Sequence, residues 1–184
     1  VDRLADYNSS IATWKASGEQ VMQTYKRQAI PMTWDFPESN VLGDKAICWL
    51  KAVKYSSDNL NASFKLNGLR PGYAVQADAS AQILSENKVI STDPPYYDNI
   101  GYADLSDFFY VWMRRSLRNI YPSLFGTMAV PKAEELVATP YRHGSKENAE
   151  SFFMDGMTRA IHKIAVQSHP AFPVSIYYAF KQSE

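Results

Sequence analysis

Short apolar runs alternate with longer helical patterns in the second half of the chain, and this alternation limits the fold more than any other feature. Three runs predict strands, at residues 73–77, 88–92 and 173–180. Helical patterns lie between them: a turn near 79–84, then 105–119 with Asp104 as N-cap, then the amphipathic stretch 147–167. Strands and helices at this spacing indicate βαβ units. The predicted fold class is α/β, with a parallel sheet flanked by helices.

The rest of the chain carries weaker signals. A length of 184 residues fits a single domain, with a helical or irregular part at 1–70 and an αβ part at 71–184. We predict helices at 17–28 and at 46–53, the second with Asp44 as its N-cap. Two segments, 56–72 and 120–145, are predicted as loops.

Composition excludes several classes of protein. The chain has 19 basic and 19 acidic residues, so its net charge is zero, unlike that of a general nucleic-acid coat protein. The single cysteine, Cys48, excludes an internal disulfide framework and a cysteine-based zinc cluster. His143, His162 and His169 lack metal-ligand spacing, so no metal site is expected. No apolar run reaches membrane-spanning length and no signal peptide is visible, so we expect a cytoplasmic protein with no membrane partner.

A four-residue motif, Asp93-Pro94-Pro95-Tyr96, follows the predicted strand 88–92. Open α/β sheets bind ligands at the carboxyl ends of their strands. The Asp93 carboxylate and the Pro94 carbonyl can accept both hydrogens of a planar amino group, and the fixed φ of proline holds the backbone in one shape. The Tyr96 ring can stack on the face of a base. The motif therefore predicts a binding site for the amino group of a base. The alternative is a turn that only ends the strand.

Residues around the motif extend the predicted site. Tyr97 and Asn99 flank the turn and are expected to line the base pocket. Arg142 and His143 belong to the loop 120–145, where contact with base or phosphate and an ordinary polar loop have equal weight. Four aromatic residues of the following helix are expected in the core: Tyr102, Phe108, Phe109 and Trp112.

The motif resembles the catalytic motif of the S-adenosylmethionine-dependent DNA amino-methyltransferases. Longer stretches resemble the C-terminal half of the large prokaryotic adenine-specific DNA methylases, which have a zinc ribbon and an N-terminal domain of unknown function. These stretches are 4–10, 28–36, 92–100, 102–112, 139–144 and 173–181, and the resemblance covers most of the chain. It implies N6-methylation of an adenine flipped out of duplex DNA, in a partial Rossmann-like fold. An Asp in the first motif position fits adenine better than the Ser form associated with cytosine N4.

The chain also departs from that family. Its members carry a glycine-rich loop of Phe-x-Gly-x-Gly type, which approaches the methionine part of the cofactor, and none of the 8 glycines here forms it. The zinc-ribbon cysteines are absent as well. Asp78, followed by Ala79, resembles the acidic position that contacts the cofactor adenine; a strand-end cap is the equal alternative.

From these departures we expect the chain to be a piece of a larger enzyme. The piece begins at Val1, and the N-terminal half of the parent is missing from it. Its incomplete sheet would expose unpaired edges, so self-association is expected. The intact parent is predicted to methylate DNA in restriction–modification or defence, and the piece alone to be inactive. Two alternatives stay open: a methyltransferase acting on RNA or on a protein glutamine, and a non-catalytic nucleic-acid-binding remnant of the same fold.

Overall fold

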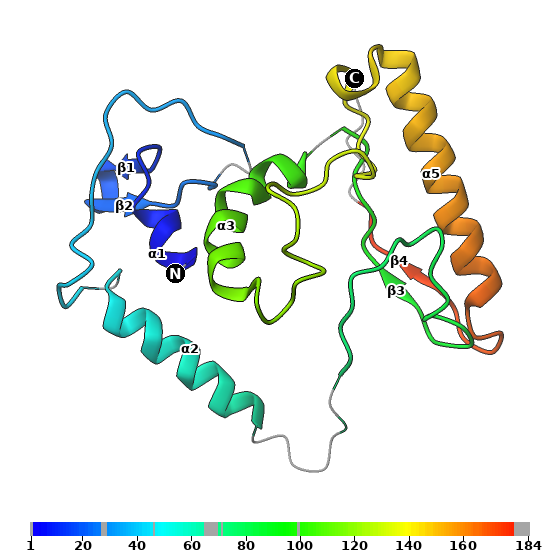
Figure 1. Ribbon diagram of the computed structural model, residues 1–184, viewed down its shortest axis with the longest axis horizontal. Coiled ribbons are helices and arrows are strands. Elements are labelled where there is room, and N and C mark those ends of the chain that lie inside the picture. The colour runs from blue at the N-terminus through cyan, green and yellow to red at the C-terminus, as the bar shows by residue number, and fades with distance from the viewer. Residues whose placement is uncertain are drawn as a thin grey trace. The chain divides into compact units, whose positions relative to one another are not determined.

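Helices and two short sheets make up the computed structural model of the chain, a mixed α/β structure (Figure 1). The structure describes residues 2–26, 29–45, 47–64, 70, 72–98 and 100–178. The chain divides into two units, the first Val1–Gly72 with Asp104–Val130, the second Tyr73–Ala103 with Pro131–Glu184. The single domain expected from the chain length stays a prediction.

The secondary structure follows the two units. The first holds α1 (Asp2–Tyr7), β1 (Thr13–Lys15), the short helix η1 (Ala16–Gly18), β2 (Gln20–Met22), α2 (Trp49–Phe64) and most of α3 (Tyr102–Leu117). The second holds β3 (Ser91–Thr92), α4 (Pro140–His143), α5 (Lys146–Gln167) and β4 (Ser175–Ile176). No helix in the described part of the chain is both long enough and apolar enough to pass through a membrane.

The helix predicted at 17–28 is wrong over its described residues, because β1 and β2 form a β-hairpin in this region. Residues 27 and 28 lie outside the described part of the chain. β1 and β2 pair antiparallel, with Thr13 opposite Met22 and Lys15 opposite Gln20. The connection 16–19 turns through Glu19, whose φ of 44° is left-handed. The β-prone Thr and Trp of β1 and Val of β2 stabilise the pair across the strands, and the pattern of one strand alone does not reveal this pairing.

α2 begins later and ends later than the helix predicted at 46–53. It starts at Trp49 rather than after Asp44, and it continues through 56–64, where a loop was predicted. Ser56 and Ser63 each donate a hydroxyl hydrogen bond to the carbonyl four residues earlier, so these polar residues are accommodated within the helix. Residue 46 lies outside the described part of the chain.

The predicted long helix at 147–167 is confirmed as α5. Gly144 takes the left-handed conformation, φ 79°, that ends α4, and Ser145 then caps α5 by accepting a hydrogen bond from the Asn148 amide at 3.1 Å. The apolar face of α5 carries the buried Phe153 of the second unit. The core cluster is Ala138, Ala149 and Phe153, with Tyr97, Leu136 and Met157 packed against it.

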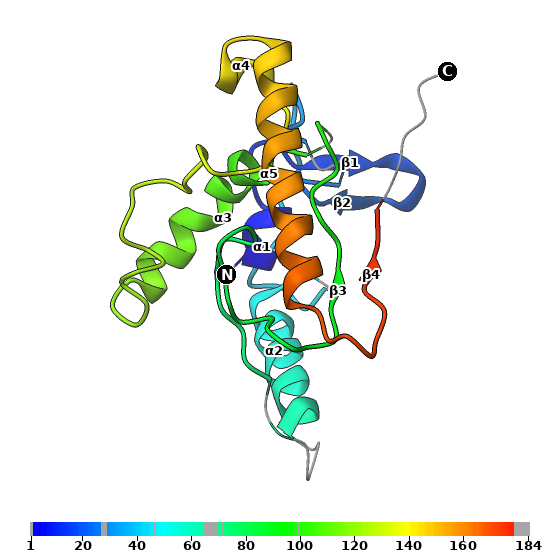
Figure 2. The same cartoon turned by 90° about the vertical axis from the view of Figure 1, so that its right-hand side faces the viewer.

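β3 and β4, which lie within the predicted strands 88–92 and 173–180, pair in parallel over two residues each, in line with the predicted parallel sheet. Ser91 lies opposite Ser175 and Thr92 opposite Ile176, and an isolated bridge joins Lys88 to Ser168. Figure 2 shows β3 and β4 side by side. Of the predicted strand 173–180, residues 179 and 180 lie outside the described part. The strand predicted at 73–77 is wrong: all five side chains are exposed and the segment has no ladder partner there.

The start of α3 also differs from prediction. The helix begins at Tyr102, so Asp104 lies inside its first turn and is not its N-cap. The Ala103 amide instead donates a hydrogen bond of 2.8 Å to the carboxylate of Glu135, 32 residues further along the chain. A distant side chain therefore satisfies an amide that a local cap would ordinarily hold.

Gly156 on α5 is buried against Leu136, and a Cβ at this position would lie 2.3 Å from Leu136 Cδ1. Overpacking costs about 1–3 kcal/mol, whereas alanine gains about 1 kcal/mol over glycine in a helix. We expect Gly156→Ala to lower the free energy of unfolding by about 1 kcal/mol in urea denaturation. The neighbouring exposed variant Asp155→Ala should stay within about 0.5 kcal/mol. Equal stability of Gly156→Ala and the wild type would contradict this packing.

Candidate functional site

The four-residue motif forms part of a pocket of about 340 Å³ in the second unit. The described residues that line it are Asp93, Pro94, Pro95, Tyr96, Tyr97, Ile100, Tyr102 and Val137. The motif follows directly from β3, at the carboxyl end of a parallel strand, as predicted. The volume lies within the range of small-molecule sites, ~300–1,000 Å³.

Asp93 and Tyr96 contact each other within the motif. The Tyr96 phenol donates a hydrogen bond of 2.5 Å to Asp93 Oδ1, and this bond raises the pKa of Tyr96. The Asp93 side chain is exposed, so its carboxylate is open to solvent and ligand. Asp93 Oδ1, an atom predicted to accept a hydrogen bond from a base amino group, therefore accepts one from Tyr96 of the same motif.

A second tyrosine, Tyr178, packs against Tyr96. The rings of Tyr96 and Tyr178 meet edge to face, with centroids 5.4 Å apart and an angle of 83°. Tyr178 follows β4, and the Tyr177 amide donates a hydrogen bond of 2.9 Å to the Thr92 carbonyl. The parallel pairing thus brings the carboxyl ends of both strands, and their tyrosines, to one edge of the sheet.

Tyr97 lines the pocket, as predicted, but its phenol is directed to helix α5. It donates a hydrogen bond of 2.7 Å to Glu150 Oε1, and this bond to the carboxylate raises the pKa of Tyr97 to about 12. The Tyr97 ring meets Phe153 edge to face with centroids 5.5 Å apart. Asn99, the other predicted flanking residue, lies outside the described part of the chain.

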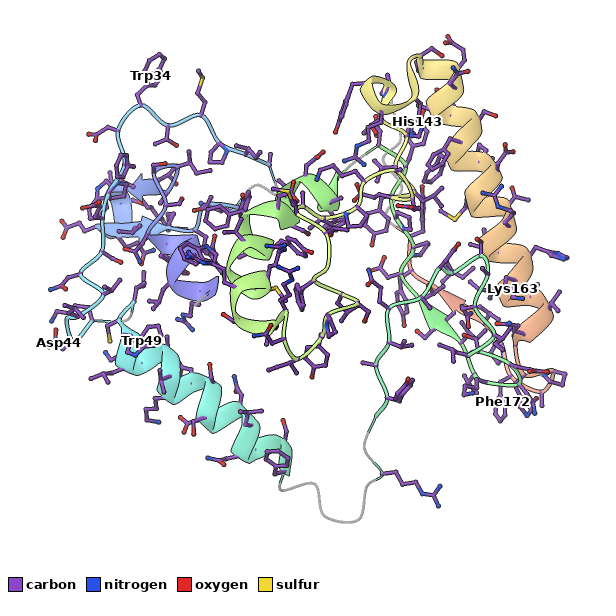
Figure 3. The ribbon with its side chains drawn as sticks, in the orientation of Figure 1. Trp34, Asp44, Trp49, His143, Lys163 and Phe172 are labelled. Atoms are coloured by element: carbon purple, nitrogen blue, oxygen red, sulfur yellow. The ribbon has the colours of Figure 1, made fainter. Side chains whose placement is uncertain are left out.

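Arg142 and His143 are not among the described lining residues of the pocket. Arg142 Nη1 forms an ion pair of 2.6 Å with Glu135 Oε2, and the two side chains are 10% and 15% exposed. The His143 ring stacks on Phe152, with centroids 4.2 Å apart, beside the start of α5 (Figure 3). Both side chains therefore pack within the second unit, and their role in contacting base or phosphate stays a prediction.

Asp78 and Ala79 lie on an exposed turn that follows no strand. Asp78 Oδ1 accepts hydrogen bonds from the Ser80 amide and the Ser80 hydroxyl, both 2.8 Å, and these bonds lower the pKa of Asp78. This is the geometry of a turn cap, close to the alternative considered for Asp78.

The described residues do not fit S-adenosylmethionine. Asp78 Oδ1 accepts both hydrogen bonds from Ser80, and Asp78 is not among the described residues that line the pocket of the motif. A Cβ at Gly72 or Gly144 would have no atom within 4 Å. Neither glycine is therefore needed for close packing of the backbone, unlike the glycines of a cofactor-binding loop. Nor does the described part of the chain bring together three His, Cys, Asp or Glu side chains that could hold a metal ion.

Sequence reasoning missed several residues of the site. Tyr102, expected in the core, is 52% exposed and lines the pocket; Trp112, also expected there, is 40% exposed. Phe108 and Phe109 are half-buried, in line with a core role. Glu150 and Tyr178 contact the motif region from segments more than 50 residues away, and no local sequence signal marks them.

Comparison of the chain with protein-family models, with curated proteins and with solved structures found no match. The interpretation of the pocket therefore depends on the chemistry of its own residues.

Proposed function

We propose that this chain holds the target amino group for a DNA adenine N6-methyltransferase. The observation that carries the proposal is the pocket of about 340 Å³ that the Asp-Pro-Pro-Tyr motif lines at the carboxyl end of β3. Asp93 and the Pro94 carbonyl would accept the two hydrogens of the exocyclic amino group, and a tyrosine ring would stack on the base. Such stacking stabilises binding by ~1–3 kcal/mol per base.

The surroundings of the pocket agree with this use. Tyr96, Tyr97 and Tyr102 give it aromatic walls, and Ile100 and Val137 add apolar surface that favours a planar ring over water. An adenine in duplex DNA would have to be flipped out to enter, so DNA is the proposed partner. Fixed acceptors in such a pocket lower the barrier by orientation, since both N–H bonds are held in one direction.

A partial Rossmann-like fold belongs to the same proposal. Parallel β3 and β4, with α5 between them in the sequence, support an arrangement of this kind. We propose that the residues which bind S-adenosylmethionine lie in a further part of the parent enzyme. The exposed edges of the two-stranded sheet would then pair with that part or with a second copy.

The binding test compares two nucleotides that differ only in the amino group. The chain, labelled with ¹⁵N and ¹³C, is titrated with deoxyadenosine monophosphate and with purine deoxyribonucleoside monophosphate, which lacks the amino group. We expect the first to shift the resonances of the lining residues and the second to bind at least ~10-fold more weakly. Equal binding of both, or shifts confined to other residues, would contradict the proposal.

Tyr96→Phe is expected to tighten binding of deoxyadenosine monophosphate by ~2- to 10-fold. The variant keeps the ring for stacking but removes the hydroxyl that occupies Asp93 Oδ1. Because this carboxylate is exposed and becomes hydrated when the hydroxyl is lost, we expect a net gain of only ~0.5–1.5 kcal/mol. Tyr102→Phe is the matched control, because it removes a hydroxyl from another lining tyrosine, and it should show no gain. Weaker binding by Tyr96→Phe would mean that the hydroxyl supports the base instead of competing with it.

Titration calorimetry with S-adenosylmethionine is expected to show no binding to these 184 residues. The expectation follows from Asp78, whose carboxylate caps a turn, and from the absence of a glycine-rich loop in the sequence. Saturable binding would place the donor site within this chain and overturn that part of the proposal.

A further inference from the structure

Tyr97 has a backbone conformation that most residues avoid. Its φ is 47°, in the left-handed region, where a bulky side chain is a costly outlier. Two other non-glycine residues in the described part of the chain have a positive φ, Glu19 and Asn87, and neither lines the pocket. Such a conformation persists only where its surroundings hold it.

Three contacts hold Tyr97 in place. Its carbonyl accepts a hydrogen bond of 3.0 Å from the Ala138 amide, and its phenol donates one of 2.7 Å to Glu150 Oε1. The ring meets Phe153 at an angle of 88° and packs against the buried core cluster of the second unit. Val137 precedes Ala138 and lines the pocket, so these contacts join two of the lining segments to α5.

Among the described residues that line the pocket, Tyr97 is the one that bonds to Glu150. Glu150 is half-buried on the first turns of α5 and is not among the described lining residues. Its carboxylate lies 3.8 Å from Lys146 Nζ, in a pair whose lysine is 73% exposed. A hydrogen bond to a carboxylate is about twice as strong as one between neutral groups, so the phenol contact is the strongest candidate for holding the turn.

We propose that Glu150 is a positioning residue of the pocket: by holding the Tyr97 phenol it fixes the left-handed turn, and with it the places of Asp93 and Tyr96. The inference depends on the proposed function for the nature of the ligand, and it adds α5 as the support of the site. Tyr97, predicted to line the base pocket, thereby gains a second role in the turn that positions the motif.

The first test follows the turn itself. A positive φ brings the amide and α protons of one residue close together, so the wild type should show an intense nuclear Overhauser effect within Tyr97. Glu150→Ala is expected to weaken this signal and to shift the Asp93 and Tyr96 resonances, with α5 still folded. Lys146→Met, which removes only the exposed partner of Glu150, should change neither. An unchanged Tyr97 signal in Glu150→Ala would overturn the proposal.

The second test follows the phenol. In the wild type Tyr97 should keep its proton through the range where an ordinary phenol, with a pKa near ~10, loses it. Glu150→Ala should return the Tyr97 titration to that range, whereas Glu150→Gln, which keeps an acceptor oxygen, should retain the Tyr97 turn. If Glu150→Ala fails to fold, Tyr97→Phe takes its place: shifted motif resonances in that variant support the proposal, and unshifted ones overturn it.

Binding of deoxyadenosine monophosphate separates the two proposals. If the wild type binds this nucleotide, Glu150→Ala should weaken binding by ~10-fold or more and Glu150→Gln by less. If the wild type does not bind it, the proposed function fails, while the turn and phenol measurements still decide the role of Glu150. If Glu150→Ala binds the nucleotide as tightly as the wild type does, the positioning role of Glu150 is wrong, whereas the proposed base pocket is still supported.

Discussion

Replacing Asp93 with alanine is expected to lower the affinity for deoxyadenosine monophosphate by roughly 10- to 100-fold. Asp93 is the charged acceptor of the motif and lines the pocket directly after β3. A hydrogen bond to a charged group stabilises by ~1.5–3 kcal/mol, which corresponds to this change in affinity. Under the proposed function, the same substitution in a methyltransferase that contains this chain should abolish methyl transfer and leave cofactor affinity nearly unchanged.

Asp98→Ala is the matched control for that experiment. Asp98 is an exposed carboxylate five positions further along, and it is not among the described lining residues. Its removal should leave affinity within about twofold, because surface charges contribute little to a specific contact. If both variants bind equally well, Asp93 does not hold the amino group.

The Tyr96 phenol gives an internal check on the Asp93 variant. Its pKa is raised because it donates a hydrogen bond to Asp93, so removal of the carboxylate should lower the pKa towards the ordinary value near ~10. The ¹³Cζ resonance of Tyr96 against pH measures this change without any ligand. A Tyr96 titration unaffected by Asp93→Ala would show that the motif's internal hydrogen bond does not form.

Local signals in the sequence predicted the parts of the fold that local contacts determine. The periodic apolar residues of α5 specify a helix by themselves, and Ser145 provides its cap. The β-prone runs near Thr92 and Ile176 predicted strands of a parallel sheet, and the motif could be placed at the end of one of them, now β3. The motif residues and Tyr97 line one pocket, and the roles predicted for them there stay predictions.

Contacts between distant segments account for what the sequence did not reveal. Ala103 is capped by Glu135 and not by a neighbour, so the start of α3 was misplaced. The segment 73–77 has strand-like residues but no ladder partner among the described residues. Strand propensity stabilises a strand only where another strand supplies hydrogen bonds. Tyr178 and Glu150 reach the motif through the parallel pairing and through α5, which no spacing rule predicts.

Arg142→Met is expected to lower the free energy of unfolding by about 3–5 kcal/mol, the largest stability effect among these variants. The arginine is paired with Glu135 at 2.6 Å, and only 10% and 15% of the two side chains are exposed. Removing one partner leaves a largely buried carboxylate without this counter-charge, which is far more costly than losing a surface pair. Glu135 also holds the Ala103 amide, so its displacement would loosen the start of α3 beside Tyr102.

Two further variants test whether the buried ion pair itself causes this loss of stability. Lys146→Met breaks the exposed pair with Glu150 and should cost no more than about 0.5 kcal/mol in urea denaturation. The double variant Arg142→Met with Glu135→Leu should recover much of the lost stability, because it removes the unpaired charge as well. If Arg142 instead serves mainly as a phosphate contact, Arg142→Met would leave stability intact and reduce the salt dependence of DNA binding by about one counterion. That result would favour contact with base or phosphate, one of the two roles that the sequence left open for Arg142.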